Sequence, residues 1–543
     1  MQPFCSAQEF RNARRLILLI DNMSNTTTEI PESRVKKTLL NARVNLIFYF
    51  ITLCLSFFSR KIFLDCLGAD FVGLTGTLQN ILGYLNLAEL GVGAAIAFNL
   101  YKPIQQRDRN QIIDLISLFG YYYRNIGLIV LSAGIILSLF IPLIFRDSNF
   151  PFGVIYFAFF SFLTSSLIGY FINYRQILLS ADQRNYVVAA YYQSANILKT
   201  IIQLTIAYYY TNFYIWIAIE LSFGIIYSII LNKKINQVYP WLKCSTSIGK
   251  AQSKNYPNIL RSTRQVFIHK IKDFLLSQSD QLFIFAFVSL KMVAYFGNYT
   301  LIITRLTMFF STILDSVGAS VGNLVAENNK GKMMQVFWEL MALRYFMAGL
   351  ICFSIYELIT PFIELWLGKE YILGNTILVI LLLNLFISIS RGTVDNFNFA
   401  YGHYGDVWAA WTEGIINVSV TLIAGYHWGI PGILLGKTFS IIPIIVFWKP
   451  FYLFKDGFAE SYAYYWSQTI KYYVIFGLSF VIVHFLLTII PINPGLSFGW
   501  WIVYAIICSG SFAILYLSLM TYFGPGGKNL IKRLPLYKIG LRI

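Results

Sequence analysis

The stretch LGADFVGLTGTLQNILGYLNLAELGVGAAIAFNLYKPIQQ, residues 67–106, is mostly apolar yet contains a carboxylate, several amides and six glycines. At helical spacing its small and polar residues fall on one side: Gly76, Gln79, Gly83, Asn86 and Glu89. A carboxylate inside a membrane costs about 2.5 to 3.5 kcal/mol on insertion scales, so it normally faces a bundle interior or an aqueous cavity. The stretch therefore predicts a membrane helix beside a polar path through the bilayer.

The composition of the 543 residues is that of a membrane protein. Hydrophobic residues make up 57% and charged residues 12%, with a mean hydropathy of +0.62 that soluble domains do not reach. The net charge is +17, but the basic residues lie between apolar segments, so membrane topology explains them better than nucleic-acid binding does. We expect a polytopic protein of the lipid bilayer that binds no nucleic acid.

The cysteines and histidines form no metal or cofactor pattern. The six cysteines are scattered without a CxxC pair, and the histidines are far apart and match neither HExxH nor a zinc motif. We expect no metal site, no cofactor and no disulfide framework.

About fourteen apolar runs are long enough to span a membrane. Their approximate cores are residues 42–64, 71–100, 112–145, 150–179, 186–210, 213–231, 266–289, 292–325, 336–367, 371–401, 407–428, 429–447, 469–490 and 498–523. The predicted fold class is an all-α polytopic membrane protein.

The distribution of lysine and arginine predicts the orientation of these spans. A cytoplasmic N-terminus places most basic residues inside, including seven in the connection 233–264. Few then fall outside: Arg60, Lys61, Arg146, Lys291 and Lys369. This asymmetry predicts that both termini are cytoplasmic.

The polar connection 233–264 divides the first six spans from the rest. VVAAY at 187–191 matches VWAAW at 407–411, an offset of about 220 residues that is typical of duplicated transporter halves. We predict a cytoplasmic segment 1–41, a six-helix bundle 42–232, a basic linker 233–264, a second six-helix bundle 265–454, two additional helices 455–523 and a basic tail 524–543. The two bundles are expected to surround a central cavity.

Polar residues recur at helical spacing within several spans. Uncharged ones usually hydrogen-bond between helices as structural contacts, whereas embedded charges must be paired or hydrated, which favours a wet cavity. The candidate substrate-binding residues are Glu89, Gln193, Lys199, Arg305, Arg391 and Glu413. The ion-coupling candidates are Asp280, Glu89 and Asp273. Asp280 and Arg305 are expected near mid-membrane, where they either serve the cavity or form a static ion pair.

Several segments carry a family resemblance. They are SRKIFLDCLGADFVGLTGTLQNILGYLNLAELGVGAAIAFNLYKPI (59–104), YRQILLSADQRNY (174–186), SDQLFIFAFVSLKMVAYFGNYTLI (279–302), VGASVGNLVAE (317–327), ELWLGKEYIL (364–373) and WGIPGILLGKTFS (428–440). Over roughly residues 34–455 the chain resembles the Wzx-type polysaccharide flippases, which belong to the multidrug/oligosaccharidyl-lipid/polysaccharide exporter superfamily.

The resemblance implies a flippase that moves undecaprenyl-diphosphate-linked oligosaccharides from the cytoplasmic to the outer leaflet for O-antigen, capsule or exopolysaccharide synthesis. It also implies a proton or sodium ion as coupling ion and polysaccharide-assembly proteins as partners. Asp280 matches a recurring acidic position in the seventh span of the family, but Gln281 follows it where asparagine is common. The family has no catalytic signature, so an enzyme is not expected.

Two other functions remain open. One is a multidrug or small-molecule exporter of the same superfamily. The other is a membrane enzyme such as a glycan polymerase, ligase or glycosyltransferase, but the predicted outside loops are short and lack clustered acid and base groups.

Overall fold

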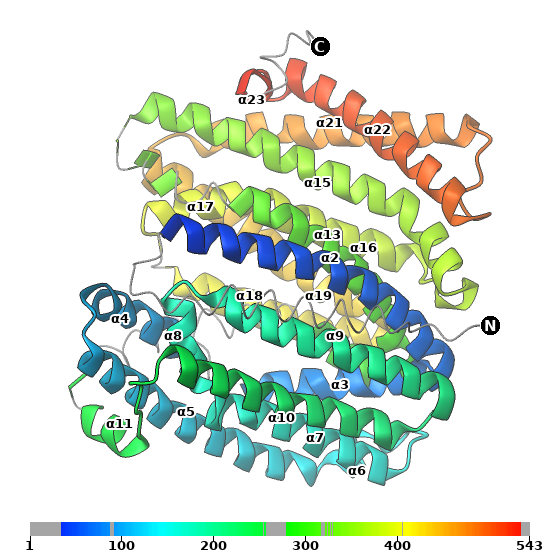
Figure 1. Cartoon of the computed structure of the whole chain (residues 1–543). Helices are drawn as coiled ribbons and strands as arrows, with labels where there is room; N and C mark the ends of the chain where they lie inside the picture. Colours follow the sequence, from blue (N-terminus) through cyan, green and yellow to red (C-terminus); the bar gives the residue numbers. More distant parts are fainter. Residues whose placement is uncertain are drawn as a thin grey trace. The chain divides into compact units, whose positions relative to one another are not determined.

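The computed structural model describes residues 34–86, 92–253, 255–256, 279–315, 321–322, 324–325, 327, 329–403 and 406–533. Every regular element in this part of the chain is a helix (Figure 1), which confirms the predicted all-α class. The chain divides into two compact units. Unit 1 comprises residues 1–67 and 82–267, and unit 2 comprises residues 68–81 and 268–543.

Eight helical runs are long and apolar enough to cross a membrane. They are Arg43–Leu67, Phe152–Phe171, Phe213–Val238, Lys330–Trp366, Asn375–Ala400, Ile430–Gly457, Tyr462–Ile489 and Phe498–Phe523. The chain is therefore a multi-pass membrane protein, as its composition predicts.

Other predicted spans coincide with helices that are shorter or more polar. These are α3 (Ala69–Leu85), α4 (Val92–Gln106), α5 (Arg109–Ser138), α9 (Asn185–Tyr210), α13 (Leu290–Asp315) and α18 (Val407–Trp428). The predicted single span 71–100 is divided between α3 and α4, and residues 87–91 between them lie outside the described residues. The predicted span 266–289 lies mostly outside them too, although residues 279–287 are helical.

Unit 1 is a bundle of long helices joined by short ones. Helix α2 (Arg34–Leu67) packs on α9, α5 packs on α7 (Phe152–Phe171), and α10 (Phe213–Val238) packs on both α7 and α9. The short elements are α6 (Ile141–Ile144), η2 (Asn173–Arg175) and α8 (Gln176–Ala181). The side chains of Asp108 and Asn212 accept hydrogen bonds from backbone N–H groups and so cap α5 and α10.

The start of the predicted linker 233–264 is helical and packed. Helix α10 continues to Val238, and α11 (Thr246–Gln252) lies against α5. A Cβ at Gly249 would overlap the carbonyl oxygen of Ser117, so glycine permits this close contact. Because α11 is held to α5, this part of the connection belongs to the bundle of unit 1.

Helices α18 and α19 (Ile430–Ile441) of unit 2 form a tight hairpin. Gly429, with φ of 61°, connects them. Cβ atoms at Gly432 and Gly436 would overlap Ala424 and Thr421 of α18, so these glycines let the two backbones approach closely. The run then continues through the π-helical η4 (Ile442–Trp448), α20 (Lys449–Tyr452) and the π-helical η5 (Leu453–Gly457).

The longest helix of unit 2, α15 (Lys330–Trp366), joins two regions. It packs on α16 (Asn375–Ser390), which η3 (Lys369–Tyr371) precedes and α17 (Gly392–Ala400) follows. It also packs on the C-terminal pair, α21 (Tyr462–Ile489) and α22 (Phe498–Phe523), and these three helices lie side by side (Figure 1). Stacked rings join α15 to the pair, such as Tyr345 on Tyr472 and Phe353 on Phe512. The terminal helix α23 (Gly527–Arg533) packs on α15 and α22.

Candidate functional site

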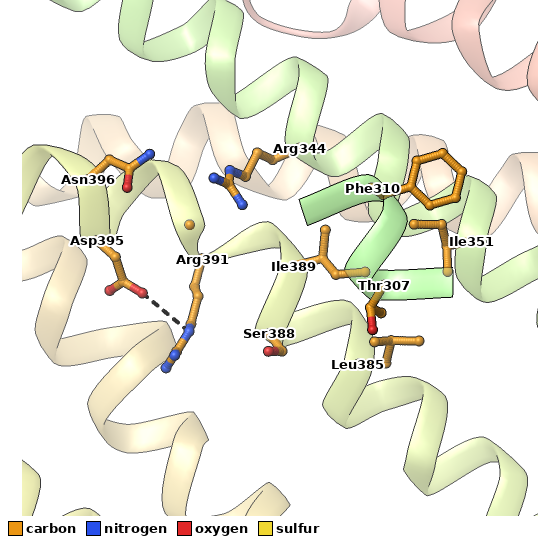
Figure 2. A pocket seen from close by; sticks show the side chains of 11 residues that line it. Thr307, Phe310, Arg344, Ile351, Leu385, Ser388, Ile389, Arg391, Asp395 and Asn396 are labelled. Atoms are coloured by element: carbon orange, nitrogen blue, oxygen red, sulfur yellow. Dashed lines mark ion pairs between the residues drawn. The ribbon is translucent and has the colours of Figure 1, made fainter. Parts of the chain in front are cut away.

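A cavity of about 350 Å³ lies within unit 2 among helices α13, α15, α16 and α17 (Figure 2). Its lining residues are Thr307, Phe310, Arg344, Ile351, Leu385, Ser388, Ile389, Arg391, Gly392, Asp395 and Asn396. This size is within the range of small-molecule pockets in proteins. Two arginines and one aspartate supply the charges, so the lining has a positive formal charge.

Arg344 of α15 is the most deeply placed of these charges. It is only 8% exposed, and Figure 2 shows its guanidinium pointing from α15 toward α17. There it lies on Gly392, where a Cβ would overlap the guanidinium atoms. Glycine at the start of α17 therefore leaves the space that the arginine fills.

Arg391 stands where α16 ends and α17 begins. Its Nε lies 3.2 Å from Oδ2 of Asp395, one helical turn further along (Figure 2). Both side chains are about one-third exposed, 33% and 37%. An ion pair with this much solvent contact is weak, so an incoming anion could displace Asp395 from Arg391.

The other lining groups add both polar and apolar character. Hydroxyl and amide groups come from Thr307, Ser388 and Asn396, while Phe310 and Ile351 contribute apolar surface. Hydroxyl and amide groups can hydrogen-bond the hydroxyls of a sugar, and paired arginine forks match phosphate oxygens. The cavity can thus hold an anion with polar substituents.

Of the predicted substrate-binding residues, Arg391 lines this cavity. Arg305 lies half-buried on α13, two residues before the lining residue Thr307. Glu413 is 1% exposed on α18. Arg305 and Glu413 were expected to line a shared cavity. Neither is among the residues that line the cavity of unit 2.

Lys199 and Gln193 lie on α9 in unit 1. The Nζ of Lys199 is 2.6 Å from Oε1 of Glu220 on α10, and Nε2 of Gln203 donates to Oε2 of the same carboxylate at 3.1 Å. The Lys199 and Glu220 side chains are 16% and 21% exposed. This arrangement links α9 to α10. Gln193 is half-buried.

Asp280 is buried in unit 2, where the positive charge of Lys437 on α19 attracts its carboxylate electrostatically. No ion pair joins Asp280 to Arg305 in the described part of the chain. The neighbouring Gln281 accepts a hydrogen bond from Nδ2 of Asn80 at 2.6 Å. Lys437 follows Gly436, which lets α19 lie against α18. The predicted candidates Glu89 and Asp273 lie outside the described residues.

Sequence reasoning did not single out Arg344, Glu220 or Lys437. All three are charges inside apolar runs, which is the signal that selected Arg305 and Glu413. Asp395 follows Arg391 by four residues, a spacing that places both side chains on one helical face. Among the described residues, no three His, Cys, Asp or Glu side chains are grouped so that they could hold a metal ion.

The fold is similar to that of known transporters. The lipid II flippase MurJ in its inward closed conformation aligns with a TM-score of 0.64 and 16% identity over 89% of this chain and 99% of that chain. An inward-facing MATE family multidrug transporter of the MOP superfamily gives 0.48 and 14% over 76% and 97% of the two chains. A mutant of the Vibrio cholerae MATE transporter VcmN gives 0.46 and 14% over 78% and 99%.

No protein-family model and no curated protein sequence matches this chain. The likeness to MurJ therefore rests on structure. It shows that the chain has a fold similar to that of this flippase structure.

Proposed function

We propose that the protein is a flippase for an undecaprenyl-diphosphate-linked oligosaccharide in surface polysaccharide synthesis, and not an enzyme. The observation that supports this most directly is the cavity with Arg344 and Arg391 among membrane helices. The fold supports it as well, because a lipid flippase shares that fold over nearly its whole length.

The charges of the cavity suit such a substrate. A diphosphate and a glycan cannot cross hydrocarbon unaided, because each unpaired polar group costs a few kcal/mol and a charge costs more. Two guanidiniums from different helices can replace the water around the phosphate oxygens. Ser388, Thr307 and Asn396 can then hydrogen-bond the first sugar. An exporter of cationic drugs is disfavoured, since both arginines would repel its substrate.

We further propose that Asp280 contributes to coupling with a proton or sodium ion. An ion drives a carrier only if its affinity differs between the two states. Lys437 is the cation that acts on Asp280 in this state, and a change in its distance would change how strongly Asp280 binds another cation. Glu89 and Asp273 remain coupling candidates. Arg305, Glu413, Gln193 and Lys199 remain candidates for the substrate path, together with Glu89.

The proposed direction of transport is from the cytoplasmic to the outer leaflet of the inner membrane, with both termini in the cytoplasm. Lys330 and Lys449 support this orientation because they lie at the same predicted inner side as the basic connection 233–264. A cysteine introduced at Asn493, between α21 and α22, should react with an impermeant reagent added outside intact cells. Protection of that cysteine would reverse the orientation.

Reconstituted protein tests the function directly. Proteoliposomes should flip undecaprenyl-diphosphate oligosaccharide, and Arg344→Ala and Arg391→Ala should each slow flipping about tenfold or more, because a charge-assisted hydrogen bond contributes about 1.5 to 3 kcal/mol. Arg124→Ala, at an exposed arginine in unit 1, is the matched control. Flipping at the wild-type rate by both cavity variants would contradict the role of the cavity, and no flipping by wild-type protein would contradict the function.

A further inference from the structure

A titratable cluster that the proposed function does not use lies where α15 packs on the C-terminal pair. At its centre is Glu357 of α15, whose Oε1 lies 2.5 Å from Nδ1 of His484 on α21. The hydroxyl of Tyr504 on α22 donates a hydrogen bond to Glu357. Three membrane helices therefore meet at one carboxylate.

The two partners differ in their access to the surroundings. The Glu357 side chain is only 10% exposed, whereas that of His484 is 46% exposed. The ring centroids of Tyr356 and Phe480 lie 6.0 and 6.1 Å from that of the imidazole. The imidazole thus presents Nδ1 to a buried carboxylate while much of its ring stays accessible.

Few other titratable groups lie near Glu357 and His484 in the described part of the chain. From α15, the titratable neighbours of His484 are Glu357 and Tyr356; from α22, those of Glu357 are Tyr504 and Cys508. From α21, His484 is the group that contacts Glu357. No lysine or arginine is among the contacts of Glu357 in the described residues. Only the imidazole, when protonated, supplies it with a positive partner there.

We propose that Glu357 and His484 form a proton-binding site on the C-terminal pair, separate from the arginine cavity. While Nδ1–H keeps its hydrogen bond to Oε1, an incoming proton binds Nε2. The pair then changes from a net charge of −1 to a neutral ion pair, and no other bond forms or breaks. Histidine is the side chain that ordinarily changes charge between pH 5 and 8.

Protonation of this site strengthens the attachment of α21 to α15. Opposite charges attract more strongly in an apolar surrounding than in water, and the ion pair exists only while the imidazole is charged. The contact therefore holds α21 to α15 more strongly when His484 is protonated than when it is neutral. Helix α15 also carries Arg344 and Ile351 to the cavity, so the site connects the pH on the predicted outer side with a helix of the cavity wall.

Thermal unfolding of the purified full-length protein in lipid nanodiscs tests this site without any transport measurement. The melting temperature of the wild type should fall by about 2 °C or more between pH 5.5 and pH 8.0. His484→Gln and Glu357→Gln should have lower melting temperatures than the wild type at pH 5.5. Their melting temperatures should change little between pH 5.5 and pH 8.0. His427→Gln, an exposed histidine at the end of α18, should retain it.

A permanent cation provides a second measurement if the glutamine variants do not fold. His484→Lys should keep at pH 8.0 the melting temperature that it has at pH 5.5. The proposal would be overturned if the melting temperature of His484→Lys, or of either glutamine variant, fell between pH 5.5 and pH 8.0 as much as that of the wild type. Because flipping is not measured, failure of the proposed function would leave these results interpretable.

Discussion

The guanidinium of Arg344 occupies the space that a side chain at Gly392 would need. These residues are 48 positions apart in sequence and lie on α15 and at the start of α17. The contact directs the buried arginine toward the junction at which Arg391 and Asp395 reach the cavity. The absence of a side chain at Gly392 on α17 therefore determines where the charge of Arg344 on α15 lies.

Gly392→Ala should displace Arg344 and impair flipping. Overpacking of this kind costs about 1 to 3 kcal/mol, and here the cost falls on the position of the guanidinium. We expect slower flipping per molecule with at most a moderate loss of protein. Gly414→Ala is the control, because nothing lies within 4 Å of its added Cβ. Equal flipping rates in the two variants, measured in proteoliposomes, would show that the position of Arg344 is unimportant.

Asp395→Asn should tighten the binding of anions to the cavity. The substitution removes the carboxylate that holds Arg391, and a partly exposed ion pair is worth about 0.2 to 1 kcal/mol, so affinity should rise by up to about fivefold. Calorimetric titration with inorganic pyrophosphate measures this. Asp65→Asn, which breaks the exposed Lys61–Asp65 pair of the same i,i+4 spacing, should bind as wild type does. Weaker binding by Asp395→Asn would mean that Asp395 itself assists the ligand.

Lys199→Met should reduce the amount of folded protein, because it leaves Glu220 without its cation in unit 1. Breaking a fully buried pair costs about 3 to 5 kcal/mol, and this partly exposed pair should cost less, whereas replacing both partners by apolar residues can be neutral. The double variant Lys199→Met/Glu220→Met should therefore recover the wild-type level, as measured by fluorescence-detected size exclusion. If Lys199→Met is instead abundant but inactive, Lys199 belongs to the substrate path.

Cys244 should react slowly with maleimides at neutral pH. Burial raises the pKa of its thiol to about 11, and the thiolate is the reactive form. The alkylation rate in membranes from a variant with Cys244 as its single cysteine should rise through pH 8 to 10. Gly249→Val, which would separate α11 from α5, should expose the thiol and accelerate the reaction at pH 7. A rapid reaction of the native thiol at pH 7 would contradict this burial.

The spans could be predicted from the sequence because hydropathy is a property of each local segment. Apolar runs such as Phe498–Phe523 and Tyr462–Ile489 can be recognised as spans without knowing which helices pack against them. Arg391 and Asp395 were also recognisable, since i,i+4 spacing alone brings them together. The resemblance to polysaccharide exporters predicted a helical transporter fold, and the structure is similar to that of a lipid flippase.

The partners of embedded charges could not be predicted in this way. The sequence around Lys199 does not reveal Glu220, which only the packing of α9 on α10 brings within 2.6 Å. An ion pair between Asp280 and Arg305 was one of two alternatives for these residues, whereas the charge that acts electrostatically on Asp280 is that of Lys437 on α19. Both contacts depend on which helices pack together, and a single sequence carries no direct signal for that choice.

The π-helical η4 has a consequence for insertions and deletions. A π turn holds one more residue than an α turn, and just beyond it Lys449 pairs with Asp406 at 2.6 Å while Tyr452 stacks on His403. Deleting one residue within 442–448 would close the wide turn into an α turn and leave the later side chains on the same face, so both contacts should survive, whereas the same deletion in an α-helical turn would rotate every later side chain by about 100°. Related chains that lack one residue within 442–448 should therefore still keep Asp406 and His403, and chains with a gap in a neighbouring α turn should lose both.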